Sequence, residues 1–189
     1  MIRLNMGCGH NRLPGFVNVD SAPECSPDQV VDLDVTPWPW KTGSVTEVAF
    51  IHSLEHMGRE TRVFLAIMQE LYRILEPGGR VTIHVPHPRH DHFLNDPTHV
   101  RVITPDLLTL FDREQNDHWQ ATGAANSPLA HYTGVDFKVI FYQSVLSEPY
   151  ISQFKAGEIT EQQLAAWALE RNNVMSEYRI QLEARKAAS

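Results

Sequence analysis

Residues 52–56 bring two histidines and a glutamate together at a spacing that zinc enzymes use. The segment reads His-Ser-Leu-Glu-His, which matches the pattern H-x-x-E-H. On a helix, two histidines four residues apart share a face and can bind zinc, while the glutamate acts as a general base. However, a mostly apolar run over residues 45–51 leads directly into His52 and predicts a strand that ends there. We therefore assign no metal ligands to this segment and expect Glu55 and His56 to begin a helix with polar surface or turn contacts.

Histidines are also concentrated in residues 84–99, around the end of another apolar run. Imidazole titrates near neutral pH, so one of these side chains can serve as a catalytic base. A structural surface loop is a second interpretation, and a metal site built from His90, His92 and Asp91 or Asp96 is a third. No spacing template decides among the three. The candidates for a catalytic role are His87, His90 and Asp96.

Glycines and acids follow three further short apolar runs. Gly7-Cys8-Gly9 follows residues 1–6, Asp20 ends residues 16–20, and residues 30–34 contain Asp32 and Asp34. Ligands bind at the carboxyl ends of the strands in parallel α/β sheets. We therefore expect these residues to meet one another and His52 at one edge of a sheet.

The glycines do not complete a dinucleotide-binding fingerprint, which has a third glycine and an acid ~20 residues further on. Here Asp20 follows Gly9 by 11 residues, and no third glycine stands at the expected place. This disfavours a pyrophosphate cradle. It does not disfavour a ligand with an adenosine, a ribose and an amino-acid end, for which Asp20 could accept hydrogen bonds from the ribose hydroxyls. Asp32 or Asp34 can accept one from the adenine amino group.

The apolar periodicity predicts the elements that position these residues. We expect strands at 1–6, 16–20, 30–34, 45–51, 80–86, 135–145 and 176–185, and helices at 60–75, 105–111 and 160–171. Residues 87–104 and 112–134 are expected to be loops. In the last segment a period of two favours a strand, with a helix as its rival. Strands that alternate with helices predict a Rossmann-like α/β fold with a mainly parallel sheet. The short first crossover leaves room for only about one turn of helix.

Several segments also occur in a characteristic order. They are residues 4–9, 15–20, 32–34 with 38–40, 44–48 leading into 52–56, and 71–79. Together they resemble the ordered motifs of class I S-adenosylmethionine-dependent methyltransferases, in the compact type-11-like branch. The resemblance covers roughly residues 2–90. It implies a seven-stranded sheet whose last strand is antiparallel, flanked by helices.

The resemblance also implies S-adenosyl-L-methionine as cofactor and suggests a role for each motif. The glycine motif would approach the amino-acid portion, Asp20 the ribose, residues 32–34 the adenine, and His52 the methionine end. The cofactor-binding residues implied are Met6, Gly7, Cys8, Gly9, Asp20, Asp32, Leu33, Asp34 and His52. The expected activity is methyl transfer to a small-molecule acceptor that the sequence does not identify. A non-catalytic cofactor- or partner-binding domain and a histidine-rich metal hydrolase are the alternatives.

Length and composition limit the remaining choices. The 189 residues are 42% hydrophobic and suit one domain, with a cofactor-binding half over about 1–86 and acceptor-side elements over about 87–189. The net charge is -7 with no basic cluster, so no nucleic-acid footprint is expected. No apolar run approaches ~18 residues, which argues against a membrane span. Two cysteines suit a reducing cytoplasm. Residues 158–189 can pack on the sheet or against a second copy in a homo-oligomer.

Overall fold

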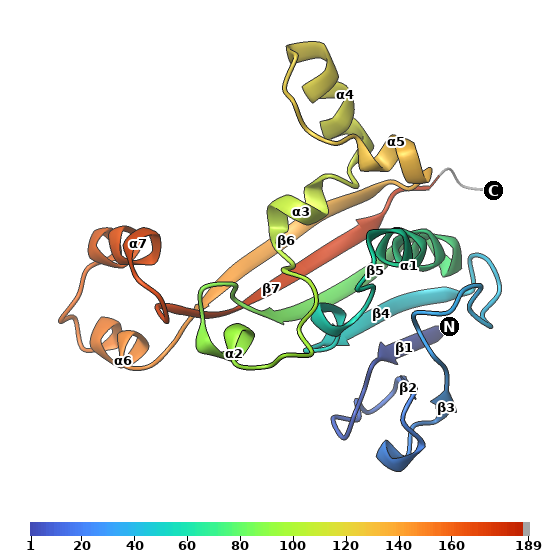
Figure 1. Cartoon of the computed structure of the whole chain (residues 1–189), viewed down its shortest axis with the longest axis horizontal. Helices are drawn as coiled ribbons and strands as arrows, with labels where there is room; N and C mark the ends of the chain where they lie inside the picture. Colours follow the sequence, from blue (N-terminus) through green and yellow to red (C-terminus); the bar gives the residue numbers. More distant parts are fainter. Residues whose placement is uncertain (187–189) are drawn as a thin grey trace.

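A computed structural model describes residues 1–186 and contains a seven-stranded sheet (Figure 1). The strand order is β3-β2-β1-β4-β5-β7-β6, and β7 pairs antiparallel with both of its neighbours. The strands are β1 (Ile2–Met6), β2 (Val17–Asp20), β3 (Gln29–Val30), β4 (Val45–Ile51), β5 (Leu75–Pro86), β6 (Phe137–Leu146) and β7 (Met175–Ala184). The predicted fold class, with an antiparallel last strand, is confirmed.

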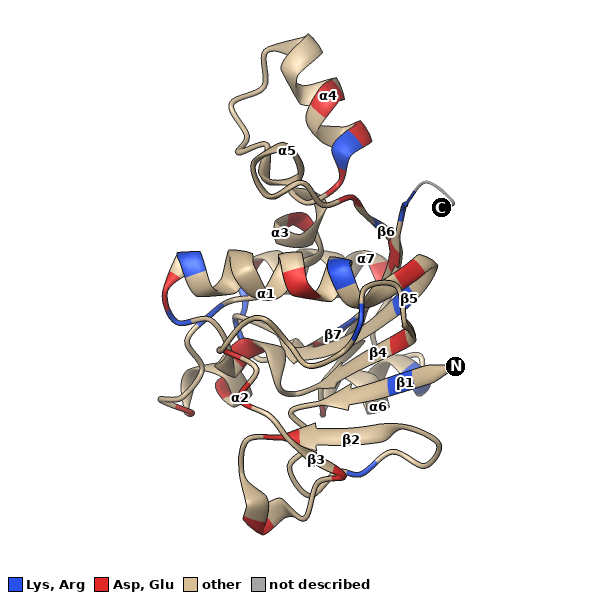
Figure 2. Cartoon of the chain, turned by 90° about the vertical axis from the view of Figure 1, so that its right-hand side faces the viewer, with Lys and Arg blue, Asp and Glu red and all other residues tan. Residues whose placement is uncertain are grey.

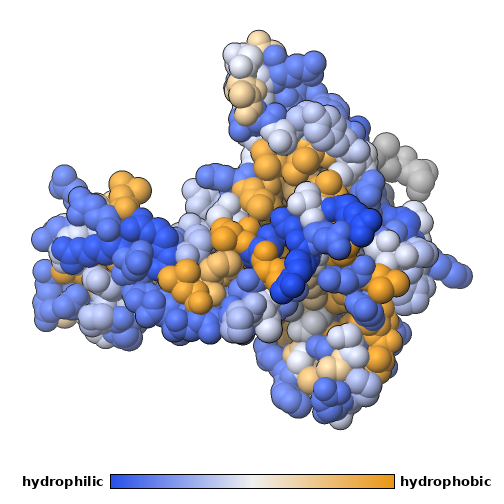
Figure 3. All heavy atoms as spheres, viewed as in Figure 1, coloured by the Kyte–Doolittle hydropathy of each residue, from blue (hydrophilic) through white to orange (hydrophobic). Residues whose placement is uncertain are grey.

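Most helices follow β5, and only two short 3-10 turns and the long helix α1 precede it. The helices are η1 (Pro23–Cys25), η2 (Leu54–His56), α1 (Thr61–Ile74), α2 (Asp91–Leu94), α3 (Pro105–Thr109), α4 (Arg113–Thr122), α5 (Leu129–Thr133), α6 (Tyr150–Lys155) and α7 (Glu161–Glu170). Between β6 and β7, α6 and α7 form an arm at the end of the molecule (Figure 1). The arm has its own small apolar cluster around Leu164 and Val174, and its surface is mostly hydrophilic (Figure 3).

The main hydrophobic core lies on one face of the sheet. Alternate residues of β5 and β7, such as Ile83 and Leu182, are fully buried and pack in one cluster with Phe64 and Ile67 of α1. Figure 2 shows α1, α3 and α5 on this side of the sheet. The intervening residues are polar and belong to the opposite face. They include Arg80, Thr82, His84, Arg179 and Gln181.

The first crossover contains no helix, since residues 7–16 form only turns between β1 and β2. A buried pair of asparagines, Asn5 and Asn18, holds this connection by hydrogen bonds. The side-chain oxygen of Asn18 accepts hydrogen bonds from Asn5 Nδ2 at 2.9 Å and from the Leu13 amide at 2.8 Å. The Asn18 amide group in turn donates to Asp28 Oδ2 at 3.0 Å. Because these bonds satisfy buried polar groups, the connection closes over the strand ends without a helix.

Three predicted elements are wrong in extent or type. The loop expected at 87–104 contains the short helix α2, which His90 caps by accepting from the His92 amide. The strand expected at 30–34 ends at Val30, because Asp32 Oδ1 accepts a hydrogen bond from the Asp34 amide and turns the chain. The loop expected at 112–134 contains α4 and α5. Asp112 caps α4 by accepting from the Gln115 amide, and Gly123 ends it in the left-handed conformation.

The other expected helices and strands are present within a few residues of their predicted bounds. The segment 176–185 forms most of β7, so its predicted strand is confirmed over its helical rival. Of the segment 158–189, the last three residues lie outside the described part of the chain. Over residues 1–186 no helix is both long and apolar enough to cross a membrane. In Figure 2 the basic residues are scattered among acidic ones.

Candidate active site

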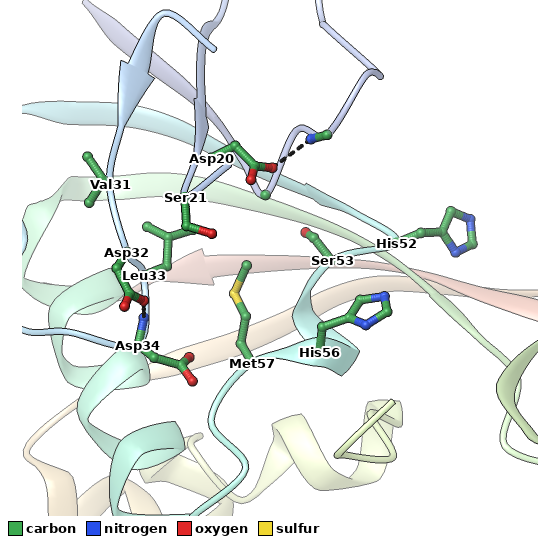
Figure 4. Close-up of a pocket in the computed structure, with 12 residues that line it drawn as sticks. Asp20, Ser21, Val31, Asp32, Leu33, Asp34, His52, Ser53, His56 and Met57 are labelled. Carbon is green, nitrogen blue, oxygen red and sulfur yellow. Dashed lines mark hydrogen bonds between the residues drawn. The ribbon is translucent and has the colours of Figure 1, made fainter. Parts of the chain in front are cut away.

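A cavity of about 340 Å³ opens at the carboxyl ends of β1, β2, β3 and β4. Its wall begins where each of these strands ends, which is where α/β sheets bind ligands. Asp32 and Asp34 lie at one end of the cavity and His52 and His56 at the other (Figure 4). The lining residues are Gly7, Gly9, Asp20, Ser21, Val31, Asp32, Leu33, Asp34, His52, Ser53, His56 and Met57.

Two glycines shape the cavity floor in different ways. Gly7 has a φ of +66°, and a Cβ at this position would lie 2.6 Å from Ser53 Cβ. Ser53 itself is fixed because its hydroxyl donates to the Met6 carbonyl at 2.7 Å. Gly9 has a φ of +48°, but a Cβ there would meet no atom within 4 Å. The chain therefore needs Gly7 for close packing, whereas Gly9 presents bare backbone to the open cavity.

Asp20 is held in place at the end of β2 by two backbone amides. Its Oδ2 accepts from the Gly9 amide at 2.7 Å, and its Oδ1 accepts from the Ala22 amide at 3.0 Å. Each carboxylate oxygen has a second lone pair, so Asp20 can accept further hydrogen bonds from a ligand. Asp34 is fixed in a similar way, because its Oδ1 accepts from the Gly58 amide at 3.0 Å. Both carboxylates are thus oriented before any ligand binds.

The structure brings most of the predicted cofactor residues together on this wall. Gly7, Gly9, Asp20, residues 32–34 and His52 line the cavity. Met6 and Cys8 do not. Met6 is fully buried in the core, and Cys8 is 4% exposed, with burial raising the pKa of its thiol.

Five lining residues were absent from the sequence-based set, namely Ser21, Val31, Ser53, His56 and Met57. Ser53 and His56 belong to the His-Ser-Leu-Glu-His segment, where only His52 was given a cofactor role. Their signal in the sequence was proximity to His52. The two apolar residues have no signal of their own, because any buried contact accounts for a Val or Met equally well.

Known structures share this arrangement of strands. A SAM-dependent methyltransferase from Archaeoglobus fulgidus matches with a TM-score of 0.62 and 15% identity, over 96% of this chain and 85% of that chain. A SAM-dependent methyltransferase from Methanosarcina mazei matches with a TM-score of 0.54 and 12% identity, over 98% and 92%. The cyclase SpnF matches with a TM-score of 0.54 and 16% identity, over 98% and 76%. No protein-family model and no curated protein matches the sequence.

This chain has the class I methyltransferase fold. The strand order and the two methyltransferase matches agree on this. At these identities the likeness describes the fold alone, and SpnF shows that a cyclase can share it.

The three candidate catalytic residues do not line the cavity of this methyltransferase fold. His87 packs on Tyr178 with ring centroids 4.8 Å apart, and its Nδ1 accepts from the Arg89 amide. His90 caps α2 by accepting from the His92 amide at 3.0 Å. Asp96 Oδ1 accepts from both the amide and the hydroxyl of Thr98. Burial lowers the pKa of His87 and of His90.

Beside this cavity lies the carboxylate of Glu55, which was expected to be a polar residue at the start of a helix. Glu55 is 1% exposed, and neither of its carboxylate oxygens has a hydrogen-bond partner. Burial raises the pKa of Glu55 to about 7. Its neighbour His56 lines the cavity, and burial lowers the pKa of that imidazole.

His52 leaves β4 with a φ of +54°, and η2 is a 3-10 turn, so His52 and His56 do not share a helix face. The H-x-x-E-H helical zinc template is therefore absent here.

Proposed function

We propose that this chain is an S-adenosyl-L-methionine-dependent methyltransferase that acts on a small-molecule acceptor. The observation that carries the proposal is the preoriented Asp20 carboxylate, which faces a cavity floored by glycine backbone in a class I methyltransferase fold. The cavity volume of about 340 Å³ also falls in the range of about 300–1,000 Å³ that is typical of small-molecule sites.

The cavity wall fits the parts of this cofactor. Asp20 would accept hydrogen bonds from ribose hydroxyls, and Asp32 or Asp34 would accept from the adenine amino group. The apolar side chains Val31, Leu33 and Met57 offer a surface on which a flat ring can pack. Gly7 and Gly9 would bring backbone close to the amino-acid portion, and His52 would border the methionine end. Residues 1–86 supply all of these groups.

When bound, the cofactor supplies an electrophilic methyl group on a sulfonium. The task of this chain is then to hold an acceptor atom in line with that methyl at close range. A protein base is needed only where the acceptor arrives protonated. We assign the acceptor side to the loop that carries His87, His90 and Asp96, because this loop reaches the cavity wall through His56. The Nδ1 atom of His56 lies 2.9 Å from the hydroxyl oxygen of Thr98, which belongs to this loop.

Cofactor turnover tests this proposal. We expect S-adenosylhomocysteine to form when the protein is incubated with S-adenosylmethionine and pooled hydroxyl, amine, thiol and sugar acceptors, as followed by mass spectrometry. An Asp20→Asn variant should lose most of this turnover, while Asp106→Ala, an exposed acid on α3, should retain it. S-Adenosylhomocysteine binding without turnover in any pool would favour the non-catalytic cofactor-binding domain instead.

A further inference from the structure

The buried carboxylate of Glu55 has no role in the proposed cofactor site. Burying a carboxylate without hydrogen-bond donors costs free energy, because the group loses its hydration and forms no hydrogen bonds in exchange. Among the described residues, the basic groups within 4.0 Å of Glu55 are two imidazoles, His52 at 3.8 Å and His99 at 3.9 Å. These distances are too long for hydrogen bonds. A cation held between this carboxylate and nearby imidazole nitrogens would give the Glu55 oxygens a partner.

The imidazoles around Glu55 are oriented by partners on their far sides. His99 is 8% exposed, and its Nδ1 lies 2.9 Å from the Phe93 carbonyl oxygen. Since a carbonyl can only accept, Nδ1 carries the proton and Nε2 keeps its lone pair. That Nε2 is the atom that lies 3.9 Å from Glu55 Oε1.

His56 is oriented in the same way. Its Nδ1 lies 2.9 Å from Thr98 Oγ1, and the Thr98 hydroxyl donates to Asp96 Oδ1 at 2.6 Å. With the hydroxyl proton directed to Asp96, Thr98 accepts from His56 Nδ1, and His56 Nε2 keeps its lone pair. Metal-binding histidines typically donate their second nitrogen to a carbonyl or carboxylate system of this kind.

These groups lie close enough together for one ion. Glu55, His56 and His99 each place one ligand atom within 4.8 Å of the other two. Ligand atoms bound to one ion at about 2.0–2.2 Å lie about 3–4 Å apart, so a small inward movement completes the site. Asp96 Oδ2, 3.9 Å from His99 Nε2, is a further carboxylate at its border.

We propose that Glu55, His56 and His99 bind one divalent transition-metal ion beside the cavity. Two imidazoles and one carboxylate form a ligand set that suits zinc or iron(II) and is unsuited to calcium or magnesium. The ligand set differs from the helical template considered for residues 52–56, because His99 replaces His52. The sequence could not indicate this, since His99 comes from a distant loop.

The position of the ion suggests a role that rests on the proposed function. His56 lines the cavity at its histidine end, away from Asp32 and Asp34 (Figure 4). An ion bound there would face the end assigned to the methyl group. It would suit an acceptor with a metal-binding hydroxyl, because a divalent ion lowers the pKa of a bound hydroxyl and favours the nucleophilic oxyanion.

Metal titration of the whole protein tests the site directly. The protein is purified without a histidine tag, treated with chelator, and titrated with Co²⁺ and Zn²⁺. We expect one ion per chain by elemental analysis and a visible ligand-field absorption with Co²⁺. Glu55→Gln and His99→Ala should weaken binding by more than about 100-fold, since they remove ligands. His118→Ala removes an exposed histidine on α4 and should bind as the parent does.

A milder variant covers the case in which the buried substitutions unfold the chain. Thr98→Val keeps the shape of an exposed residue but removes the hydroxyl that orients His56, and should weaken binding about 10- to 100-fold. No stoichiometric ion in the parent, or parent-like affinity in Glu55→Gln, would overturn the metal site. S-Adenosylhomocysteine binding is measured in parallel. A parent protein that binds S-adenosylhomocysteine but no metal ion would overturn this inference and leave the proposed function standing.

Discussion

Replacing Asp20 with alanine is expected to weaken S-adenosylhomocysteine binding by at least about 100-fold. The carboxylate is already held by the Gly9 and Ala22 amides and keeps free lone pairs toward the cavity. A hydrogen bond to a charged group contributes about 1.5–3 kcal/mol, and about 1.4 kcal/mol is a factor of ten in affinity. Loss of two ribose contacts therefore gives the expected effect, measured by calorimetric titration.

Two further variants separate the ligand contact from the fold. Asp20→Asn keeps one oxygen for the Gly9 amide and removes the charge, so we expect a smaller loss of roughly tenfold. Asp106→Ala removes an exposed acid on α3 that does not line the cavity, and it should leave the affinity unchanged. If Asp20→Ala bound as tightly as the parent, the assignment of this end of the cavity to a ribose would be wrong.

Alanine substitution is expected to destabilise the fold more at Gly7 than at Gly9. Gly7→Ala places a methyl 2.6 Å from Ser53 Cβ and requires a left-handed backbone, with φ +66°. Strain and overpacking of this kind cost about 1–3 kcal/mol each, so at about 2–4 °C per kcal/mol the melting temperature should fall by roughly 4–24 °C. Gly9→Ala meets no atom within 4 Å and should destabilise the fold by only about 1–2 kcal/mol.

The main effect of Gly9→Ala is expected on the affinity for S-adenosylhomocysteine, not on the stability of the fold. A methyl at Gly9 projects into open space on the cavity wall, so we expect S-adenosylhomocysteine binding to fall at least about tenfold in a well-folded protein. Thermal unfolding and titration of the same samples distinguish the two effects. Parent-like binding by Gly9→Ala would show that the ligand does not approach this backbone.

Much of the sheet could be predicted because its strands are short apolar runs that end in glycines, acids or a histidine. The strand over 45–51 and the helix over 60–75 have such clear periodicity that their bounds shift by a residue or less. By contrast, α4 is polar along most of its length and has only one buried residue, Asn116. Its start and end depend on Asp112 and Gly123, which are weak signals without an apolar stripe.

The cavity could be predicted where the residues follow strands directly, as Gly7, Gly9 and Asp20 do. The cluster around Glu55 could not. It depends on a carboxylate that the fold buries and on His99, which a loop brings back from 44 positions further along the chain. Pairings of this kind depend on tertiary contacts, and the periodicity of a single sequence does not contain them.

Calorimetric titration of the purified parent protein with S-adenosylhomocysteine tests the central claim most directly. The cavity built from Asp20, the two glycines and residues 32–34 predicts micromolar binding with one ligand per chain. The absence of heat at adequate concentration, together with no shift in melting temperature, would contradict the cofactor site. The function of this protein would then have to be sought at the cluster of Glu55, His56 and His99 instead.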